Sequence, residues 1–347
     1  MAGGGSGGHV IPSLAVAQEL RGRGHSCVFI GTRAGFEARL VPAAGFPIEY
    51  IEIGGLKRVG VARVVRTLAQ LPIGILYTRR LLRQLRPAAI FSMGGYVAGP
   101  VVLAGSLERI PIFIMEPNAM PGFTNRWIAR AVRRALLNFP EAARFFPKGR
   151  SEVTGLPVRP EFFSIPCKSR ETKLTILITG GSQGSRTLNN SARESWSRFR
   201  QADFAVRFIH QAGRHAHQEI AAEFAQTGLD GEVVPYIDDM PAAFAQADLI
   251  VCRSGAGATA ELAAAGKPSI LVPLPTAADD HQLHNARAFE RAGAARLVLD
   301  RDMNGQRLFE EVSALANTTA LSEMCDNARV FAHPGAANRA ADLMEQA

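Results

Sequence analysis

The chain has 347 residues, 47% of them hydrophobic, and a formal net charge of +8 at pH 7. This length favours two domains, because single hydrophobic cores stop growing at roughly 250–300 residues. The composition excludes a disordered chain, and the longest apolar run, at 71–77, is too short for a membrane-spanning helix of about 20 residues.

Charge divides the chain into two unlike parts. Residues 1–150 contain 20 Lys/Arg and 7 Asp/Glu, a net charge of +13, whereas residues 151–347 carry a net charge of −5. The first part is therefore expected to face an acidic partner. The four cysteines are scattered without CxxC spacing, which fits a reducing compartment and indicates neither a zinc site nor a disulfide framework.

Short β-rich runs alternate with helical stretches in both parts, which is typical of parallel sheets covered by helices. In the first part the runs lie at 27–30, 88–91, 112–114 and 135–137. In the second part they lie at 174–178, 205–209, 249–252, 269–272 and 295–299. Between the two parts, Pro157, Pro160, Pro166 and the polar run 168–173 indicate an interdomain linker.

Each part begins with a glycine-rich loop, at 3–8 and at 180–184. The sequence therefore predicts an α/β protein with two Rossmann-like domains that face a cleft. We expect the first domain to span 1–160 and the second 161–334, with a last helix at 335–347 packed on the first domain. Only Met1 and Ala2 precede the first loop, so the strand that should lead into this loop is expected to be missing. A start that lies upstream is the favoured explanation, and a truncated chain is the alternative.

Gly3, Gly5 and Gly8 have the GxGxxG spacing that brings backbone amides close to a phosphate. An NAD site also needs an acidic residue after the next strand, where Arg33 and its neighbours stand instead. NAD is therefore disfavoured, and Arg33 leaves an NADP-dependent oxidoreductase as an alternative.

His9 directly follows this loop, at the expected start of a helix. Histidine ordinarily titrates near neutral pH, so this side chain could accept a proton from an attacking hydroxyl group. A solvated histidine at a helix entry explains the sequence equally well.

The most informative segment runs from Cys252 to Glu261. It leaves a buried strand, turns through small residues and enters an alanine-rich helix. Small side chains let a diphosphate approach the positive end of the helix dipole. Glu261, one turn further on, could accept two hydrogen bonds from a ribose diol, or could merely complement the helix dipole.

Polar residues cluster again after two prolines, in a loop expected to overhang the cleft. They are His281, Gln282, His284 and Asn285. Their amides suit sugar hydroxyls. A metal site formed with Asp279 and Asp280 is the rival interpretation, but the longer-range ligand pattern of a known site is absent and we expect no metal. The DxD match at Asp300 and Asp302 is interpreted as a solvated turn.

No acidic residue occurs between Glu52 and Glu108, where basic and apolar residues interleave. The basic residues are Lys57, Arg58, Arg63, Arg66, Arg79, Arg80, Arg83 and Arg86, and the apolar ones include Val61, Val64, Val65, Leu68, Leu71, Ile73, Ile75, Leu76, Leu81 and Leu82. This pattern suits an anionic membrane surface. Nucleic acid is disfavoured because Tyr77 is the only aromatic residue within the basic segment 57–86, and an ordinary amphipathic helix is the plain alternative.

Seven short motifs occur in a joint order that is specific to one family. They are Gly4-Gly5-Ser6-Gly7-Gly8-His9, Met93-Gly94-Gly95-Tyr96, Glu116-Pro117-Asn118, Gly155-Leu156-Pro157-Val158-Arg159, Gly180-Gly181-Ser182-Gln183-Gly184, Ile237-Asp238-Asp239-Met240 and Arg253-Ser254-Gly255-Ala256. In these the chain resembles the MurG family of UDP-N-acetylglucosamine transferases, which complete the lipid-linked peptidoglycan disaccharide on the cytoplasmic membrane face.

The resemblance implies a GT-B fold in which the second domain holds the UDP-sugar. Ser182 and the helix start at Ala256, Gly257, Ala258, Thr259 and Ala260 would hold the diphosphate, Ile237 the uracil through its backbone, and Glu261 the ribose. Gln282 and Asn118 would contact the sugar, Arg159 would lie near the domain junction, Ser6, Gly7 and Gly8 would line the first-domain side, and His9 would be the base. The chain departs from the family pattern at Ser6, usually threonine, at Met115 and Pro117, usually histidine and glutamine, within 256–260, and at His281, usually glutamine.

The implied reaction moves GlcNAc, with inversion, from UDP-GlcNAc to the C4 hydroxyl of undecaprenyl-pyrophosphoryl-MurNAc-pentapeptide. It needs no obligatory cofactor or metal, and the enzyme would sit peripherally on the cytoplasmic face of the membrane. Two further alternatives stay open: a GT-B transferase with another lipid acceptor, such as diacylglycerol, and a non-catalytic UDP-sugar-binding partner of a membrane complex.

Overall fold

The computed structural model describes residues 1–347 apart from 5–6, 53–60, 96, 168–172, 203 and 317–318, and of 61–71 it describes only the backbone. The chain forms two compact units. The first domain is Met1–Pro157 with Gly335–Ala347, and the second is Val158–Pro334. In the described part of the chain, no helix combines the length and the apolar character needed to cross a bilayer.

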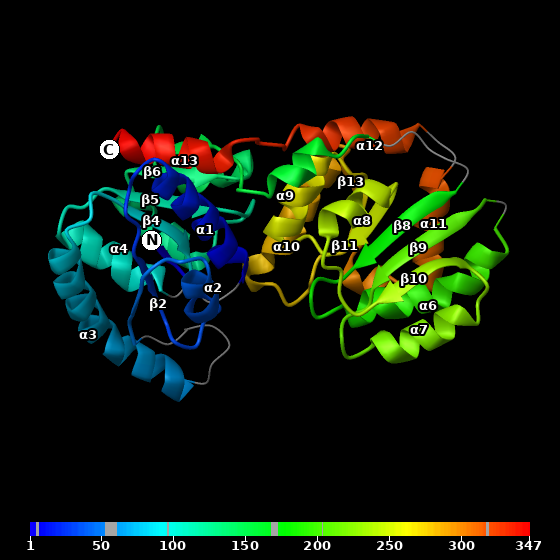
Figure 1. Ribbon diagram of the computed structural model, residues 1–347, viewed down its shortest axis with the longest axis horizontal. Coiled ribbons are helices and arrows are strands. Elements are labelled where there is room, and N and C mark those ends of the chain that lie inside the picture. Colours follow the sequence, from blue (N-terminus) through cyan, green and yellow to red (C-terminus); the bar gives the residue numbers. More distant parts are fainter. Residues whose placement is uncertain (5–6, 53–60, 96, 168–172, 203, 317–318) are drawn as a thin grey trace. The chain divides into compact units, whose positions relative to one another are not determined.

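The first domain is built on a seven-stranded parallel sheet with the order β3-β2-β1-β4-β5-β6-β7 (Figure 1). Its strands are β1 Ala2–Gly3, β2 Phe29–Gly31, β3 Ile48–Tyr50, β4 Ile90–Gly94, β5 Ile112–Glu116, β6 Arg134–Leu137 and β7 Ser151–Val153. The central strands β4 and β5 are buried along their whole length, as expected where helices cover both faces of a parallel sheet.

The strand predicted to be missing is present in shortened form. β1 occupies the centre of the first sheet and pairs in parallel with both β2 and β4. Met1 extends the pairing, since its amino group donates to the Val28 carbonyl at 2.8 Å and its carbonyl accepts from the amide of Ile30 at 2.9 Å. The prediction was wrong here because two residues before a glycine loop give no apolar run, although two are enough to bridge the neighbouring strands.

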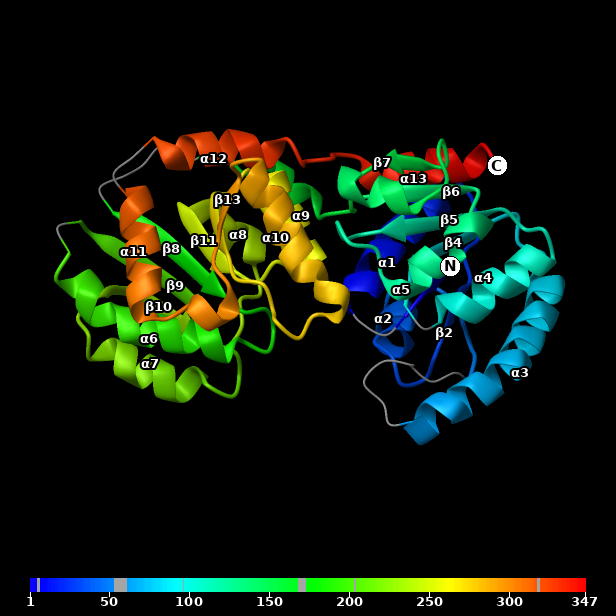
Figure 2. The same ribbon diagram turned by 180° about the vertical axis from the view of Figure 1, so that it is seen from behind.

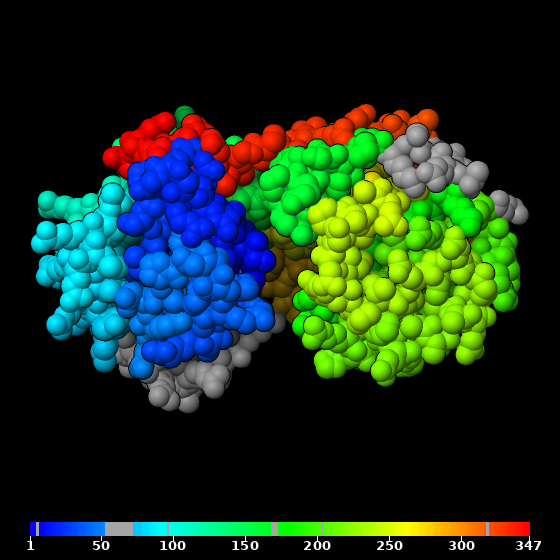
Figure 3. Space-filling model, in the orientation of Figure 1, coloured from blue at the N-terminus to red at the C-terminus, as the bar shows by residue number. Residues whose placement is uncertain are grey.

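Helices cover the first sheet: α1 Gly7–Gly22, α2 Glu37–Ala43, α3 Val61–Leu85, α4 Ala98–Leu107, α5 Phe123–Ile128 and α13 Ala336–Glu345, with 3-10 turns at Ala129–Ala131 and Pro140–Phe145. The C-terminal helix α13 belongs to this domain. Arg23, which follows α1, donates to Asp342 at 2.7 Å and to Glu345 at 2.8 Å. Figure 3 shows the red C-terminal segment lying against the blue residues of α1.

The second domain repeats the plan with a six-stranded parallel sheet of order β10-β9-β8-β11-β12-β13. Its strands are β8 Leu174–Thr179, β9 Val206–Gln211, β10 Asp230–Val234, β11 Leu249–Cys252, β12 Ser269–Leu271 and β13 Ala295–Leu297. Its helices are α6 Arg186–Arg200, α7 His217–Ala225, α8 Met240–Gln246, α9 Ala256–Ala265, α10 His281–Arg291, α11 Gly305–Ala316 and α12 Ala320–Arg329, with 3-10 turns at Pro160–Ser164, Ala278–Asp280 and Asp300–Asp302.

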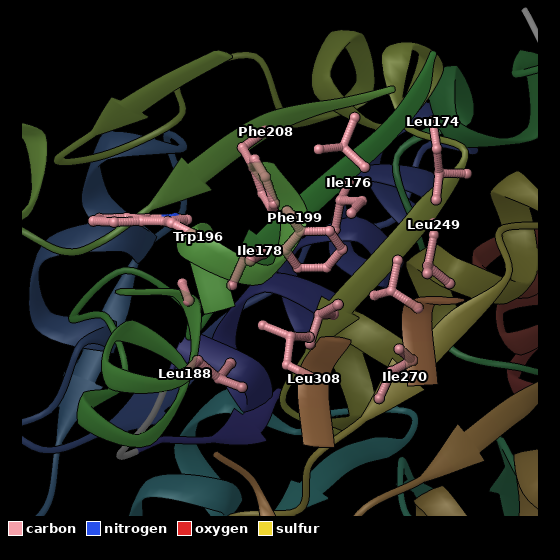
Figure 4. Packing of buried hydrophobic residues seen from close by; sticks show 14 of the residues in the cluster. Leu174, Ile176, Ile178, Leu188, Trp196, Phe199, Phe208, Leu249, Ile270 and Leu308 are labelled. Carbon is pink, nitrogen blue, oxygen red and sulfur yellow. The ribbon is translucent and has the colours of Figure 1, made fainter. Parts of the chain in front are cut away.

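The core of the second domain forms between β8 and the helices on one face of the sheet (Figure 4). Leu174, Ile176 and Ile178 alternate along β8 and are fully buried. Phe199 of α6 packs edge-on against Phe208 of β9, with ring centroids 5.2 Å apart. This apolar layer fixes the C-terminal ends of β8, β9 and β11, where ligands of such sheets bind.

The predicted linker is shorter than the sequence suggested. The chain passes between domains at Pro157 and Val158, and Pro160–Ser164 already packs within the second domain. Phe162 is fully buried there, with its ring 5.0 Å from that of Phe244. The prolines alone do not show that Phe162 packs into the second domain. The polar residues 168–172 lie outside the described residues.

The expectation of four unpaired cysteines is corrected for two of them. Cys167 and Cys325 of α12 form a disulfide, with their Cα atoms 6.6 Å apart. They are separated by 158 residues in the sequence, so no local spacing could indicate the pair. Cys27 and Cys252 are free thiols.

Candidate active site

The start of α9 is an open group of backbone donors in the second domain. β11 is buried throughout and ends at Cys252, and α9 begins at Ala256 after an extended Gly255 that provides no side-chain cap. The first amides of a helix lack partners within the helix, so those of Ala256, Gly257 and Ala258 are available to an acceptor. A Cβ atom on Gly257 would meet no atom within 4 Å. The arrangement suits a diphosphate at the positive end of the helix dipole.

Thr259 and Ala260, unlike the first residues of α9, are not exposed at this opening. Both are buried, and the Thr259 hydroxyl donates to the carbonyls of Gly255 and Ala256. They therefore hold the turn in place, and their predicted contact with the diphosphate stays a prediction.

Glu261 lies on α9 and is largely buried. Burial raises the pKa of its carboxyl group to about 7, and the nearby Arg159 guanidinium opposes this shift. Arg159 is the second residue of the second domain and also lies over the Phe162 ring, with Cζ 5.1 Å from the ring centroid. In its ionised form this carboxylate is suited to accept hydrogen bonds from a neutral diol.

Gln282 lies beside the α9 opening. Its side-chain oxygen accepts from the Leu274 amide at 3.0 Å, and its nitrogen lies 4.0 Å from the Cβ position of Gly255. The Ser254 hydroxyl donates to the Gln282 carbonyl at 2.8 Å and fixes the start of α10 against the end of β11. Gln282 thus presents an amide donor next to the proposed phosphate position.

The polar cluster at 281–285 is divided by the structure. Asn285 is fully buried and its amide donates to the Ser254 carbonyl at 3.1 Å, so its expected contact with sugar hydroxyls is wrong in this structure. The His281 ring nitrogen Nδ1 bonds the Ala278 carbonyl at 2.8 Å. Just before it, Asp279 and Asp280 both adopt left-handed conformations, with φ of 53° and 52°. Strain of this kind concentrates at functional sites.

The second glycine loop links β8 to α6. Gly184 has φ +75°, and a Cβ atom there would overlap the Ala212 carbonyl, so only glycine fits. Ser185 caps α6 by accepting from the Leu188 amide at 3.3 Å. Ser182, in the same loop between β8 and α6, is exposed. The loop can therefore present a hydroxyl group to a ligand.

Gln211, at the end of β9, links the backbone at Gly181 to the backbone at Ile237. It is 1% exposed, its amide nitrogen donates to the Gly181 carbonyl at 2.7 Å, and its oxygen accepts from the Ile237 amide at 2.9 Å. The Ile237 N–H is therefore engaged within the protein. Backbone recognition of uracil at Ile237 is left with the carbonyl oxygen as its acceptor.

Arg253 connects the loop after β8 to the segments that follow β12 and β13. Its guanidinium donates to the Ser185 hydroxyl at 2.7 Å, to Asp300 at 2.5 Å and to the Val272 carbonyl at 3.1 Å. Asp300 is therefore not a solvated turn residue, which corrects the interpretation of the DxD match. Asp302 is exposed, and its carboxylate lies 3.7 Å from the Arg301 guanidinium.

In the first domain, His9 lies in the first turn of α1. Its Nδ1 bonds the Gly4 carbonyl at 3.3 Å, and the glycine turn after β4 covers the ring. A Cβ atom on Gly95, where φ is +80°, would lie 3.0 Å from the Gly4 oxygen and 3.4 Å from His9 Nδ1. With its proton on Nδ1, the neutral imidazole carries its lone pair on Nε2, the form that a general base needs.

The remaining first-domain predictions are placed as follows. Gly7 and Gly8 are the first two residues of α1, and Ser6 lies outside the described residues. Asn118 follows β5, and its backbone amide and side-chain nitrogen donate to Glu116 at 2.9 and 3.2 Å. Asn118 belongs to the first domain and Gln282 to the second, so their shared role in sugar binding stays a prediction.

Glu116 is a buried acid that sequence reasoning missed. It also accepts from the Gly122 amide at 3.1 Å and from the Asn125 side chain at 2.8 Å. Burial nevertheless raises its pKa to about 7, against the effect of these four hydrogen bonds. Glu116 therefore sets the loop that carries Asn118.

The missed residues share one weak sequence signal. Glu116 and Gln211 are polar residues at the ends of buried strands, and Arg253 directly follows the apolar strand β11. At the carboxyl end of a parallel strand such residues point to the ligand edge of the sheet. Their partners come from other strands, and these contacts cannot be read from one segment.

Comparison with known proteins follows the same division of the chain. The model of the glycosyltransferase family 28 N-terminal domain matches residues 1–137, and that of the family 28 C-terminal domain matches residues 175–346. An enzyme of Solibacter usitatus named "UDP-N-acetylglucosamine--N-acetylmuramyl-(pentapeptide) pyrophosphoryl-undecaprenol N-acetylglucosamine transferase" is 63% identical over 346 residues, covering all of this chain and 95% of the relative. The Halorhodospira halophila enzyme of the same name is 44% identical over 353 residues, covering all of this chain and 97% of its own.

A solved structure extends the comparison to three dimensions. The crystal structure of Acinetobacter baumannii MurG superposes with a TM-score of 0.86 at 34% identity, covering all of this chain and 98% of that one. The two Rossmann-like domains are thus those of the GT-B fold. The chain belongs to the MurG family, within glycosyltransferase family 28.

Proposed function

We propose that this protein transfers N-acetylglucosamine from UDP-GlcNAc to undecaprenyl-pyrophosphoryl-MurNAc-pentapeptide, the step from lipid I to lipid II in peptidoglycan synthesis. The observation that carries the proposal is the uncapped first turn of α9 beside Glu261, in a chain that is 63% identical over its full length to the Solibacter enzyme. A nucleoside diphosphate fits that turn, because amides meet the phosphates and a carboxyl group meets the ribose.

The helix start also assists the chemistry. When the C4 hydroxyl of MurNAc attacks C1 of GlcNAc in line, the C1–oxygen bond to the diphosphate breaks with inversion and UDP leaves as an anion. The amides of Ala256, Gly257 and Ala258 stabilise the charge that develops on this leaving group. We therefore propose that transfer needs no metal ion and continues in the presence of EDTA.

His9 is the proposed base. Its Nδ1 bonds the Gly4 carbonyl, so Nε2 is the atom that would take the proton of the acceptor hydroxyl as the new bond forms. Ser182, Ile237, Glu261 and Gln282 are proposed to bind the donor, and Gly7, Gly8 and Asn118 to act from the first domain.

Association with the membrane is proposed to use α3. Ile73 and Leu76 are 69% and 63% exposed and Tyr77 is 50% exposed, and these three lie on one face of the helix. Arg80 and Arg83, one and two turns later, are also exposed. Apolar side chains flanked by arginines suit the cytoplasmic, anionic face of a membrane. The basic residues Lys57 and Arg58 lie outside the described residues, as do the side chains of 61–71.

The NADP-dependent alternative loses its support. Arg33, which had kept it open, lies over the Tyr50 ring, with its guanidinium carbon 4.5 Å from the centroid, and the chain belongs to a glycosyltransferase family. Two rivals remain, a transferase of the same fold with another lipid acceptor and a non-catalytic UDP-sugar-binding partner of a membrane complex.

A transfer assay tests the proposal directly. Labelled UDP-GlcNAc is incubated with a soluble lipid I analogue, or with diacylglycerol, in EDTA-containing buffer. We expect label on the lipid I analogue alone. Label on diacylglycerol would favour the rival, and binding of UDP-GlcNAc without any transfer would indicate the non-catalytic alternative.

The base assignment has its own test. His9→Ala should lower kcat by about 10²-fold or more and leave UDP-GlcNAc binding nearly unchanged. His25→Ala is the matched control, because His25 is a first-domain histidine that pairs with Glu345 at 2.8 Å outside the site. Unchanged turnover in His9→Ala would reject this residue as the base.

Membrane binding is tested with vesicles of anionic phospholipid. Leu76→Asp should weaken cosedimentation with the vesicles, because it places a negative charge on the apolar face of α3. Val330→Asp is the control, since Val330 is 75% exposed but belongs to the second domain. Equal behaviour of the two variants would argue against α3 as the membrane surface.

A further inference from the structure

A pocket of 630 Å³ lies in the first domain at the sheet edge where β5, β6 and β7 begin. It is lined by the start of these strands, by the end of α4, and by Leu343 and Gln346 at the end of α13. Figure 2 shows α13 beside β6 and β7. The glycine loop and His9 follow the opposite ends of parallel strands, so this pocket is separate from the proposed active site.

Four arginines line the pocket: Arg109, Arg133, Arg134 and Arg150. Arg134 donates to the Gly149 carbonyl at 3.0 Å and Arg150 to the Val132 carbonyl at 3.2 Å, so two guanidinium groups are held in place by backbone oxygens. Within the described part of the chain, none of the four forms an ion pair, and no acidic residue lines the pocket.

The acidic residues next to the lining in sequence are all engaged elsewhere. Within two positions of a lining residue these are Glu108, Glu152, Asp342 and Glu345, and Asp342 pairs with Arg23 at 2.7 Å. Glu108 pairs with Arg79 and Arg83, Glu345 with Arg23 and His25, and Glu152 with Arg339. The four positive charges of the pocket are therefore not neutralised by the carboxylates nearest to them in the chain.

Arg109 follows α4 in the left-handed conformation, with φ 57°, where glycine is the usual residue after a helix. A side chain with a Cβ atom costs roughly 1–2 kcal/mol in that conformation. The backbone therefore favours glycine at this position, so the arginine can be replaced by glycine without added strain.

We propose that this pocket binds an anionic ligand that carries two phosphate groups. Guanidinium groups recognise phosphate oxygens through paired, charge-assisted hydrogen bonds. A phosphate group carries about one negative charge at pH 7 as a diester and up to about two as a monoester, so four arginines are enough to balance two such groups. The volume lies in the range of roughly 300–1,000 Å³ that is typical of small-molecule sites, which is more than one phosphate needs.

Two sources can supply this chemistry, a soluble diphosphate or the headgroup region of anionic lipids. The first arm of the test is calorimetric titration of the full chain with inorganic pyrophosphate. Arg109→Gly should weaken binding by about tenfold or more, because charged hydrogen bonds of 1.5–3 kcal/mol are lost. Glycine suits φ 57°, so this variant should fold with an unchanged or higher Tm.

Arg86→Gly is the matched control. Arg86 also follows a helix in the left-handed conformation, with φ 44°, and is exposed, but it does not line the pocket. Both variants lose one positive charge, so only a specific site separates them. Pyrophosphate can also bind at the start of α9, but neither substitution changes that site. An unchanged KM for UDP-GlcNAc in both variants verifies that the α9 site is intact.

The second arm replaces pyrophosphate by vesicles of phosphatidylglycerol, with phosphatidylcholine vesicles for comparison. If Arg109→Gly and Arg133→Gln, but not Arg86→Gly, bind pyrophosphate more weakly than the wild type, the result supports a soluble ligand. If the two pocket variants lose only their binding to the anionic vesicles, the result supports a lipid. Equal affinities of the Arg109→Gly and Arg86→Gly variants in both arms, or no saturable binding in either, would overturn the proposal.

Discussion

Arg253 and Asp300 form a 2.5 Å ion pair at the carboxyl edge of the second sheet, and the same guanidinium binds the hydroxyl that caps α6. The pair joins the glycine loop after β8 to the turn after β13. Both side chains are largely shielded from water, at 14% and 21% exposed. The ion pair therefore holds these loops in place and adds little to the surface charge of the protein.

We predict that Arg253→Lys raises the KM for UDP-GlcNAc by about tenfold, because one ammonium group cannot replace a fork that bonds Ser185, Asp300 and two carbonyls. Steady-state kinetics with varied donor measure this. Asp302→Asn is the control, since Asp302 is exposed and makes only a 3.7 Å contact with Arg301. A KM unchanged in both variants would show that the pair does not position the donor site.

Glu261 should give donor binding a pH dependence. Because burial raises its pKa to about 7, the carboxyl group is increasingly neutral below pH 7 and ionised above it. The ribose hydroxyls donate more strongly to the ionised form, so the KM for UDP-GlcNAc should rise as pH falls through 7. Glu261→Gln should raise this KM by roughly tenfold at pH 8 and flatten its pH dependence. Glu290→Gln, an exposed change on α10, should behave like the wild type.

Glu116 should make stability depend on pH. Its pKa is about 7 in the folded protein and about 4.5 when unfolded, so folding favours the protonated form. Its contribution is fully present below pH 4.5 and is lost as pH rises to 7, by on the order of 3 kcal/mol.

Glu116→Gln removes this titration. The free energy of unfolding of the wild type relative to the variant, from urea titration, should therefore be higher at pH 5 than at pH 8. Glu49→Gln, an exposed change on β3, should show no such difference. If the difference in unfolding free energy between the wild type and Glu116→Gln is the same at pH 5 and at pH 8, the assignment is refuted.

Gly95 should position His9. Gly95→Ala places a Cβ atom 3.0 Å from the Gly4 oxygen and 3.4 Å from His9 Nδ1, in a conformation that alanine disfavours. We expect kcat to fall by about tenfold or more, with the KM for UDP-GlcNAc unchanged because the donor residues belong to the other domain. Gly99→Ala, which meets no atom within 4 Å on α4, should leave kcat intact. A rise in KM together with the fall in kcat would point to general misfolding instead.

The strands that sequence could predict are those with continuous apolar character. β11 was predicted at its observed bounds and β8 within one residue. Three of the four missed strands, β3, β7 and β10, lie at sheet edges and are partly exposed, so they carry no apolar run. The fourth, β1, is central but only two residues long.

The candidate site shows the same limit in another form. The segment from Cys252 to Glu261 is local, and its open helix start follows from small residues alone. The burial of Asn285, the engagement of the Ile237 amide by Gln211, and the role of Asp300 depend on contacts between segments 26 to 47 residues apart. The pattern of a single sequence does not show which of its distant segments will contact each other.

The attachment of α13 to the first domain has a practical consequence for any attempt to isolate the halves of this enzyme. A fragment that stops at Pro157 would lack the partners of Arg23 and His25 and one wall of the arginine pocket. A first-domain fragment must therefore carry residues 335–347 joined after Pro157, whereas the second domain can be expressed as one uninterrupted stretch.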